Sequence, residues 1–232
     1  MTPEILAALE QAKRDKRPVV LATRLPSGEQ RLLPDPAAPA ALNQAAEQAL
    51  RLDESGTHKV DEQDWFLHAY NPPLRLVIVG AVHIAQALAP FAAQCGFAVT
   101  VVDPRRSFAS EDRFPGVTIS SAWPDEAMEE FRPDSRTAVV TLTHDPKLDD
   151  PALDRALKSD AFYIGALGSR RTHAARLKRL TDLGHTPEAM ARIKGPVGLN
   201  IEAVTATEIA VSVIAEIIAT RRNSPLGHGT AT

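Results

Sequence analysis

The sequence predicts an α/β protein in which a doubly wound parallel sheet follows a small N-terminal α+β unit. Residues 75–103, RLVIVGAVHIAQALAPFAAQCGFAVTVVD, have the pattern of a buried strand, a glycine turn, a helix and a second strand. Strand-like runs recur after it, with helical patterns between most of them, at residues 117–120, 137–142 and 161–164. Alternation of this kind is typical of a Rossmann-like parallel sheet with helices on both faces.

The first 73 residues have a different character. They contain a helical pattern over residues 3–14, a strand-like run over 19–23, an alanine-rich helical pattern over 38–52 and the segment WFLHAY over 65–70. Asn71-Pro72-Pro73 then marks a boundary, because proline cannot continue a sheet ladder. We therefore expect three parts: an α+β unit over 1–73, a Rossmann-like domain over 74–222 and a flexible tail over 223–232.

Composition excludes several classes of protein. The chain has 232 residues and a formal charge of −3, so it lacks the surplus of Lys and Arg that nucleic-acid binding requires. We find neither a signal-peptide pattern nor an uninterrupted apolar stretch long enough to span a membrane, and we expect a cytoplasmic protein. The single cysteine, Cys95, excludes an intramolecular disulfide and cannot alone form a thiolate zinc site, and we predict no metal site.

Helix starts are marked by capping residues. Asp150-Pro151 and Thr186-Pro187 each place a capping side chain before a proline at the first helical position. The segment Thr205-Ala-Thr-Glu208 is a capping box, and it predicts the start of a long final helix.

In an open parallel sheet, ligands bind beyond the carboxyl ends of the strands, so the residues there are the candidate site. Gly80 supplies the first turn, and Asp103 ends the second strand, where an acidic group can meet a ribose hydroxyl. Val82 occupies the second glycine position of the dinucleotide fingerprint, which argues against ordinary dinucleotide binding. His83 falls in the first helical turn, where it either donates to a ligand oxygen or makes a local hydrogen bond.

Two further turns carry polar residues. Thr143, His144 and Asp145 follow the fourth strand, and they either reach into the crevice or form an Asp-Pro turn with a threonine cap. Gly165, Gly168, Ser169 and Arg170 mark the next strand-to-helix turn. A helix N-terminus with a hydroxyl and a guanidinium suits a phosphate or carboxylate; the alternative is a serine N-cap with solvated arginines.

Cys95 lies near the far end of the first helix of the sheet domain, away from the strand ends. A sulfurtransferase needs a thiolate in an accessible, electropositive place. The negative, C-terminal end of a helix dipole disfavours a thiolate, so we interpret Cys95 as structural or inert.

Five runs together resemble one family: GAVHIAQAL at 80–88, VVDPR at 101–105, TLTHDPKLDDPAL at 141–153, FYIGALGSRRTHAARLKRL at 162–180, and GPVGLNIEAVTATEIAVSVIAEI at 195–217. In order and spacing they are similar to the XdhC/CoxI family of xanthine dehydrogenase accessory proteins, over residues 74–222. Two departures stand out. Glu202 occupies a position where relatives commonly have glycine, and residues 1–73 lack the GS-x-P-R segment and the cysteine of many relatives.

The resemblance implies a protein that binds the molybdenum cofactor (molybdopterin), supports its sulfuration and inserts it into apo xanthine dehydrogenase. Such a protein is a cofactor chaperone more than a catalyst, and we assign no catalytic residue. A cysteine desulfurase and a homodimer are further partners that it leaves open. The candidate cofactor-binding residues are Gly80, His83, Asp103, Thr143, His144, Asp145, Gly165, Gly168, Ser169 and Arg170.

The alternative function is a Rossmann-type oxidoreductase that uses NAD(P). Asp103 supports it by position. Val82 and the lack of an evident acid or base for hydride transfer oppose it.

Overall fold

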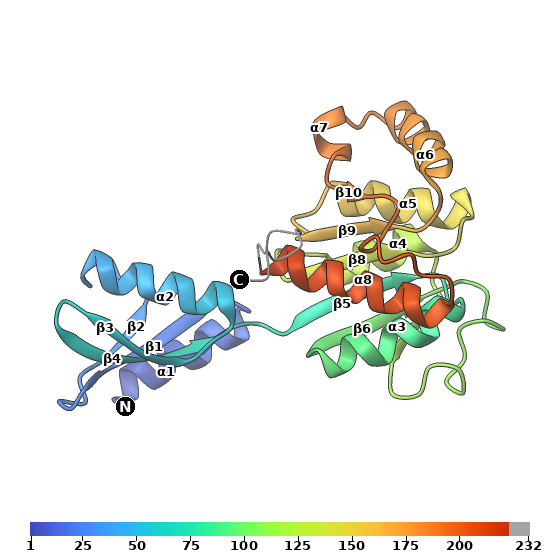
Figure 1. Ribbon diagram of the computed structural model, residues 1–232. Coiled ribbons are helices and arrows are strands. Elements are labelled where there is room, and N and C mark those ends of the chain that lie inside the picture. Colours follow the sequence, from blue (N-terminus) through green and yellow to red (C-terminus); the bar gives the residue numbers. More distant parts are fainter. Residues whose placement is uncertain (223–232) are drawn as a thin grey trace. The chain divides into compact units, whose positions relative to one another are not determined.

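The computed structural model describes residues 1–222, and the tail predicted over 223–232 lies outside the described residues. The chain divides into two compact units, Met1–Pro72 and the part from Pro73 onward (Figure 1). Each unit has its own sheet and its own core.

The N-terminal unit is a small α+β unit, as predicted, and it is built on a four-stranded antiparallel sheet. Its strands lie in the order β2-β1-β4-β3, and successive side chains alternate between the two faces. One face packs on α2 and the other on α1, so two small apolar clusters form. The elements are α1 (Pro3–Arg14), β1 (Val19–Leu25), β2 (Gln30–Leu33), α2 (Ala40–Leu52), β3 (Gly56–Val60) and β4 (Gln63–Tyr70).

The second unit contains a six-stranded sheet in the order β10-β9-β8-β5-β6-β7, and every paired strand is parallel to its neighbour. Counted from β5 as the first strand, this is the Rossmann order 3-2-1-4-5-6. The predicted fold class is therefore confirmed. The strands are β5 (Leu74–Val79), β6 (Phe97–Val102), β7 (Thr118–Ser120), β8 (Thr137–Thr141), β9 (Tyr163–Ala166) and β10 (Ile193–Lys194). Strand β10 was not predicted, because two residues are too few to show a hydrophobic period.

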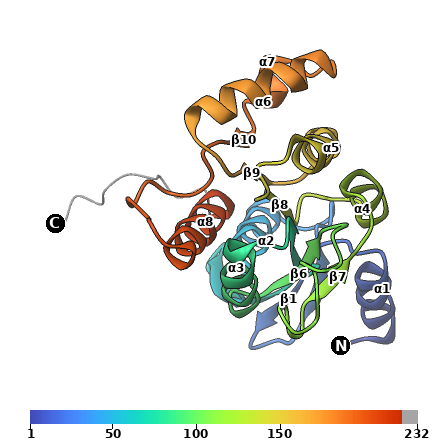
Figure 2. The same ribbon diagram turned by 90° about the vertical axis from the view of Figure 1, so that its right-hand side faces the viewer.

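Helices cover both faces of this sheet (Figure 2). Leu76 and Ile78 of β5 point to the side of α3 (His83–Gln94) and α8 (Ala206–Arg221). Val77 and Val79 point to the opposite side, where α4 (Pro124–Phe131), α5 (Pro146–Leu157) and part of α6 (Arg170–Asp182) pack. Burial on both faces explains why residues 76–79 of β5 form a continuous apolar run. The short helix α7 (Pro187–Met190) precedes β10.

Two of the three predicted helix starts are correct. Thr205 and Glu208 form the capping box of α8, with both reciprocal bonds present, and Thr186 caps α7. The prediction at Asp150-Pro151 is wrong. Helix α5 begins at Pro146 behind an earlier Asp-Pro pair, because the Asp145 carboxylate accepts the Lys147 N–H at 2.9 Å and satisfies the same capping rule.

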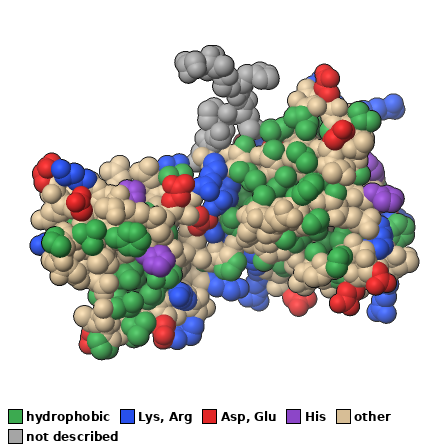
Figure 3. All heavy atoms as spheres, turned by 60° about the horizontal axis from the view of Figure 1, so that its bottom comes forward, with side chains coloured by type: hydrophobic (Ala, Val, Ile, Leu, Met, Phe, Trp, Pro, Cys, Tyr) green, Lys and Arg blue, Asp and Glu red, His purple; other side chains and the backbone are tan. Residues whose placement is uncertain are grey.

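The surface of the second unit includes apolar areas. Figure 3 shows one face of it on which apolar side chains are exposed and charged ones lie mainly toward the edges. Helix α8 adds Val211, which is 44% exposed. Among residues 1–222, none of the helices combines the length and apolarity needed to cross a bilayer.

Candidate functional site

The candidate site lies where the strand order reverses, between β5 and β8. Ligands of open α/β sheets bind in the crevice at this switch point, outside the carboxyl ends of the strands. We call the segments that follow the strands the crevice loops: residues 80–83 after β5, 103–106 after β6, 142–146 after β8 and 167–170 after β9. Val79 pairs with Thr141, so the loops after β5 and β8 start side by side.

Gly80 permits the close approach of these two loops. Its φ is 107°, and a Cβ added there would lie 2.4 Å from Thr143 Cγ2. Leu142 N donates to Val79 O at 2.9 Å, which fixes the loops at this short distance. Glycine is therefore required both for its backbone conformation and for its lack of a side chain.

Asp103 directly follows the last residue of β6, at the predicted strand end, and it is fully buried. Its carboxylate accepts the Ala81 N–H at 2.8 Å and the Arg105 N–H at 3.0 Å, and both oxygens also receive the Arg105 guanidinium, at 2.9 and 2.7 Å. Burial by itself would raise the pKa of Asp103, but the hydrogen bonds from Arg105 and Ala81 lower it. Both carboxylate oxygens thus already have protein partners that join the turn after β5 to the loop after β6.

The loop after β8 follows the turn-and-cap arrangement for two of its three polar residues. The Thr143 hydroxyl donates to Asp149 Oδ1 at 2.7 Å and accepts the Asp145 N–H at 3.0 Å, while the Asp145 carboxylate caps α5. His144 differs, because its side chain is exposed and its φ is 67°. A Cβ added to Gly168 would lie 3.7 Å from His144 Nδ1. The His144 side chain therefore lies beside the crevice loop after β9.

The turn after β9 supplies the start of α6. Gly168 has φ 128°, and the Ser169 hydroxyl accepts the Thr172 N–H at 3.2 Å. Arg170 and Arg171 are exposed in the first turn, where helical N–H groups have no partner within the helix. Gly165 was predicted in this turn but lies inside β9, where an added Cβ would approach Val197 Cγ2 to 2.5 Å.

The N-termini of α3, α5 and α6 all follow strands at this edge of the sheet. They differ in charge. Asp145 places a carboxylate on α5, whereas α3 begins at Val82 without a side-chain cap and carries the exposed His83. Of these three helices, α6 alone adds guanidinium groups to the positive end of its dipole. An anion in this crevice is therefore favoured most at α6.

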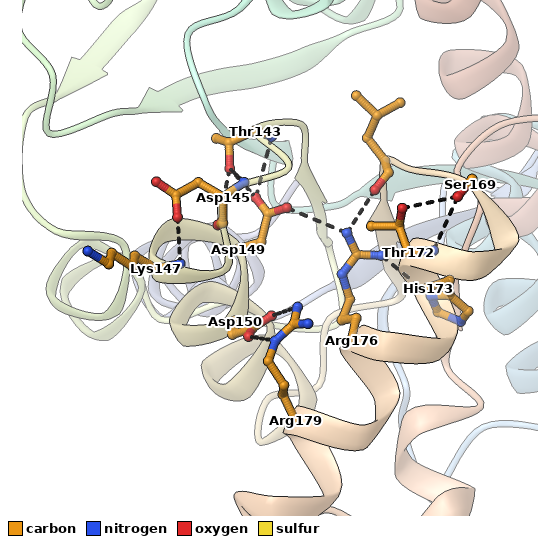
Figure 4. Close-up of polar contacts among 11 residues, drawn as sticks. Thr143, Asp145, Lys147, Asp149, Asp150, Ser169, Thr172, His173, Arg176 and Arg179 are labelled. Carbon is orange, nitrogen blue, oxygen red and sulfur yellow. Dashed lines mark hydrogen bonds and ion pairs between the residues drawn. The ribbon is translucent and has the colours of Figure 1, made fainter.

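Beneath the crevice loops lies a buried ion pair that was not predicted from the sequence (Figure 4). Asp149 of α5 and Arg176 of α6 are each 1% exposed, and Arg176 Nη2 lies 3.5 Å from Asp149 Oδ2. The same nitrogen donates to Leu167 O at 2.7 Å. Burial raises the pKa of Asp149 and lowers the pKa of Arg176. The signal in the sequence was two adjacent acids on one helix and two arginines three residues apart on another.

A second ion pair joins the same helices closer to solvent. Arg179 Nη2 donates to Asp150 Oδ1 at 3.0 Å, and the Arg179 side chain is 38% exposed. Cys95, in contrast, is exposed at the C-terminal end of α3, remote from the crevice loops, as expected. Within residues 1–222, no three His, Cys, Asp or Glu side chains form a group that could hold a metal ion.

Comparison with known proteins identifies the second unit. A family profile described as the XdhC Rossmann domain matches residues 76–217. The chain is 37% identical over 158 residues to a probable xanthine dehydrogenase subunit of Bacillus subtilis, covering 68% of this chain and 46% of the relative. It is 35% identical over 152 residues to the molybdenum cofactor insertion chaperone PaoD of Escherichia coli, covering 66% and 42%. The chain thus spans less than half the length of these curated relatives.

One solved structure resembles the chain along nearly its whole length. It is a crystal structure described as a xanthine dehydrogenase from Bacillus halodurans, with a TM-score of 0.69 and 24% identity. The match covers 98% of this chain and 66% of that one. At this identity the likeness establishes the fold alone.

Proposed function

This chain belongs to the XdhC family, and from that premise we propose that it is an accessory protein that binds the molybdenum cofactor and passes it to apo xanthine dehydrogenase. The names of two relatives, a molybdenum cofactor insertion chaperone and a probable xanthine dehydrogenase subunit, support this function. The cofactor is cargo in this proposal, and the crevice is its carrier site.

The observation that carries the proposal is the start of α6. Molybdopterin ends in a phosphate, and the first turn of α6 offers free N–H groups, the positive end of the helix dipole and the exposed guanidinium of Arg170. Gly168, with φ 128°, lets the chain turn into α6 while packing closely against Thr172, because an added Cβ would lie 3.0 Å from Thr172 Cγ2. Two cations at a helix N-terminus are unfavourable by themselves, so a bound anion would compensate for them.

The remaining candidate residues would hold the pterin end. His83 and His144 are exposed at the loops after β5 and β8, and each offers ring nitrogens to a heterocycle. Thr143, Asp145 and Asp103 act in this proposal by shaping the loops, because their oxygens already have protein partners. Gly80 and Gly165 act by permitting close packing.

We also propose that sulfuration of the cargo is carried out by a separate enzyme, of the cysteine desulfurase class, while this chain holds the cofactor. The exposed Cys95 lies at the far end of α3 from the crevice loops, so it is unsuited to carry the sulfur.

NAD(P)-dependent oxidation is the second candidate function, favoured by the strand order and the position of Asp103. Two observations weigh against it. A ribose hydroxyl would have to displace Arg105 from a carboxylate that is fully buried, and Val82 places a branched side chain where the pyrophosphate approaches the backbone.

The test is identification of the ligand, followed by a matched pair of substitutions on α6. Mass spectrometry of small molecules that co-purify with the chain should find a pterin phosphate; NAD or NADP would refute the carrier function. Arg170→Ala should weaken molybdenum cofactor binding by roughly 1.5–3 kcal/mol, the range for a hydrogen bond to a charged group. Lys178→Ala removes an exposed cation from a later turn of the same helix and should leave affinity unchanged. Equal effects of the two substitutions would exclude a specific phosphate site.

A further inference from the structure

The buried ion pair connects two crevice loops, those after β8 and β9 (Figure 4). Asp149 Oδ1 accepts the hydroxyl of Thr143, in the loop after β8. Arg176 Nη2 donates to the carbonyl of Leu167, in the loop after β9. On its other side, Arg176 Nη1 lies 3.5 Å from Nδ1 of His173.

His173 extends this chain of contacts to the segment after β10. A Cβ added to Gly195 would lie 2.2 Å from His173 Nδ1, so the imidazole packs directly against that glycine. Val197 N, two residues on, donates to Ala166 O at the end of β9. One guanidinium therefore stands at the centre of contacts that reach the carboxyl ends of β8, β9 and β10.

We propose that Asp149 and Arg176 are positioning residues, a clamp that holds the loops after β8 and β9 at a fixed separation and so forms the cofactor site before the ligand arrives. The identity of the ligand in this inference rests on the proposed function. Figure 4 shows Thr143 on one side of the clamp and Ser169 on the other, and His144 and Arg170 are the next residues along the chain. In this proposal neither clamp residue touches the ligand: Asp149 acts through the hydroxyl of Thr143, and Arg176 acts through the carbonyl of Leu167.

Stability alone does not explain this pair. Removing two charges from water is costly, and apolar pairs of similar volume are often as stable as a buried ion pair. Here the cost is increased, because Arg176 Nε is buried with no hydrogen-bond partner in the described chain. What the planar guanidinium provides is fixed geometry, because one group contacts Asp149, Leu167 and His173 in set directions.

The chain provides its own control. Asp150 and Arg179 join the same two helices as the clamp, one residue along α5 and three along α6. That outer pair is partly exposed, and the side-chain hydrogen bonds between its members run from helix to helix without involving a crevice loop. We therefore compare the clamp double variant Asp149→Asn/Arg176→Met with the control double variant Asp150→Asn/Arg179→Met. Both remove one ion pair between α5 and α6 without leaving a lone buried charge.

Each full-length variant is compared with the wild type by three measurements. They are chemical denaturation, hydrogen exchange of the backbone amides in residues 142–145 and 167–170, and affinity for molybdenum cofactor by ultrafiltration and metal analysis. The clamp variant should exchange faster in both segments and bind the cofactor about tenfold more weakly, because the ligand must now order the loops. The control variant should stay within about twofold of the wild type in affinity, because the hydrogen bonds between its two side chains involve no crevice loop. Arg176→Lys keeps the charge but loses the fork, and it should resemble the clamp variant.

The possible outcomes separate the two proposals. Unchanged loop exchange and unchanged affinity in a folded clamp variant would overturn the clamp, and so would equal losses in the clamp and control variants. Should the clamp variant not fold, the comparison of Arg176→Lys with the control decides in the same way. A wild-type chain that binds no cofactor would refute the proposed function, and hydrogen exchange would still decide whether the clamp orders the loops.

Discussion

Replacing Gly80 by alanine tests the geometry at the switch point. An alanine there must adopt φ near 107°, a left-handed conformation that costs an L-residue about 1–2 kcal/mol. Its Cβ would also stand 2.4 Å from Thr143 Cγ2, an overlap that adds about 1–3 kcal/mol. We therefore expect Gly80→Ala to lower the free energy of unfolding of the second unit by about 2–5 kcal/mol.

Thr143→Ser separates the two costs. Serine lacks the clashing methyl group but keeps the hydroxyl that donates to Asp149. The double variant Gly80→Ala/Thr143→Ser should recover about 1–3 kcal/mol relative to the sum of the single variants. Gly184→Ala is the matched control, because Gly184 has φ 91° and no heavy atom within 4 Å of an added Cβ. It should cost only the conformational part, about 1–2 kcal/mol.

Urea denaturation followed by tryptophan fluorescence measures these energies. The chain has 2 tryptophans, Trp65 in the first unit and Trp123 in the second, so a Trp65→Phe background reports on the second unit. If Gly80→Ala costs no more than Gly184→Ala, or if Thr143→Ser recovers nothing, the close approach of the two loops is not what requires glycine at this position.

Three further predictions address charge, strain and the thiol. Since its pKa is lowered on folding, Asp103 should contribute stability that is present above its unfolded pKa of about 3.9 and lost as pH falls through the lower folded value; Asp103→Asn should flatten the acid limb of a plot of urea midpoint against pH, and an unchanged limb would contradict the assignment. Glu202 has φ 57°, so Glu202→Gly should raise the free energy of unfolding by up to about 1 kcal/mol, seen as a higher Tm; a lower Tm would mean that the carboxylate makes a needed contact. Cys95→Ser should leave both Tm and cofactor affinity unchanged, and loss of target-enzyme activation with cofactor still bound would restore the sulfur-carrier hypothesis.

The sequence by itself determined the fold class and most of the elements. Continuous apolar runs indicate strands buried on both faces, and helical spacing between them indicates the covering helices; both signals are local in the chain. The capping box at Thr205 is equally local, and it was predicted correctly. The start of α5 was misplaced because two Asp-Pro pairs lie in the same segment, and a capping rule cannot choose between them.

Only the tertiary structure decided how the candidate residues are used. Asp103 lies at the end of the second strand of the domain as expected, directly after Val102, but its carboxylate is bound by Arg105 and Ala81. The contact with Ala81 depends on the pairing of β5 with β6. The ion pair of Asp149 and Arg176 joins helices that the chain separates by a strand and two loops, so no periodicity marks it. Sequence patterns record which face of an element is apolar. Which polar groups meet beneath a crevice depends on how strands are ordered in the sheet, and that order is set by packing between distant segments.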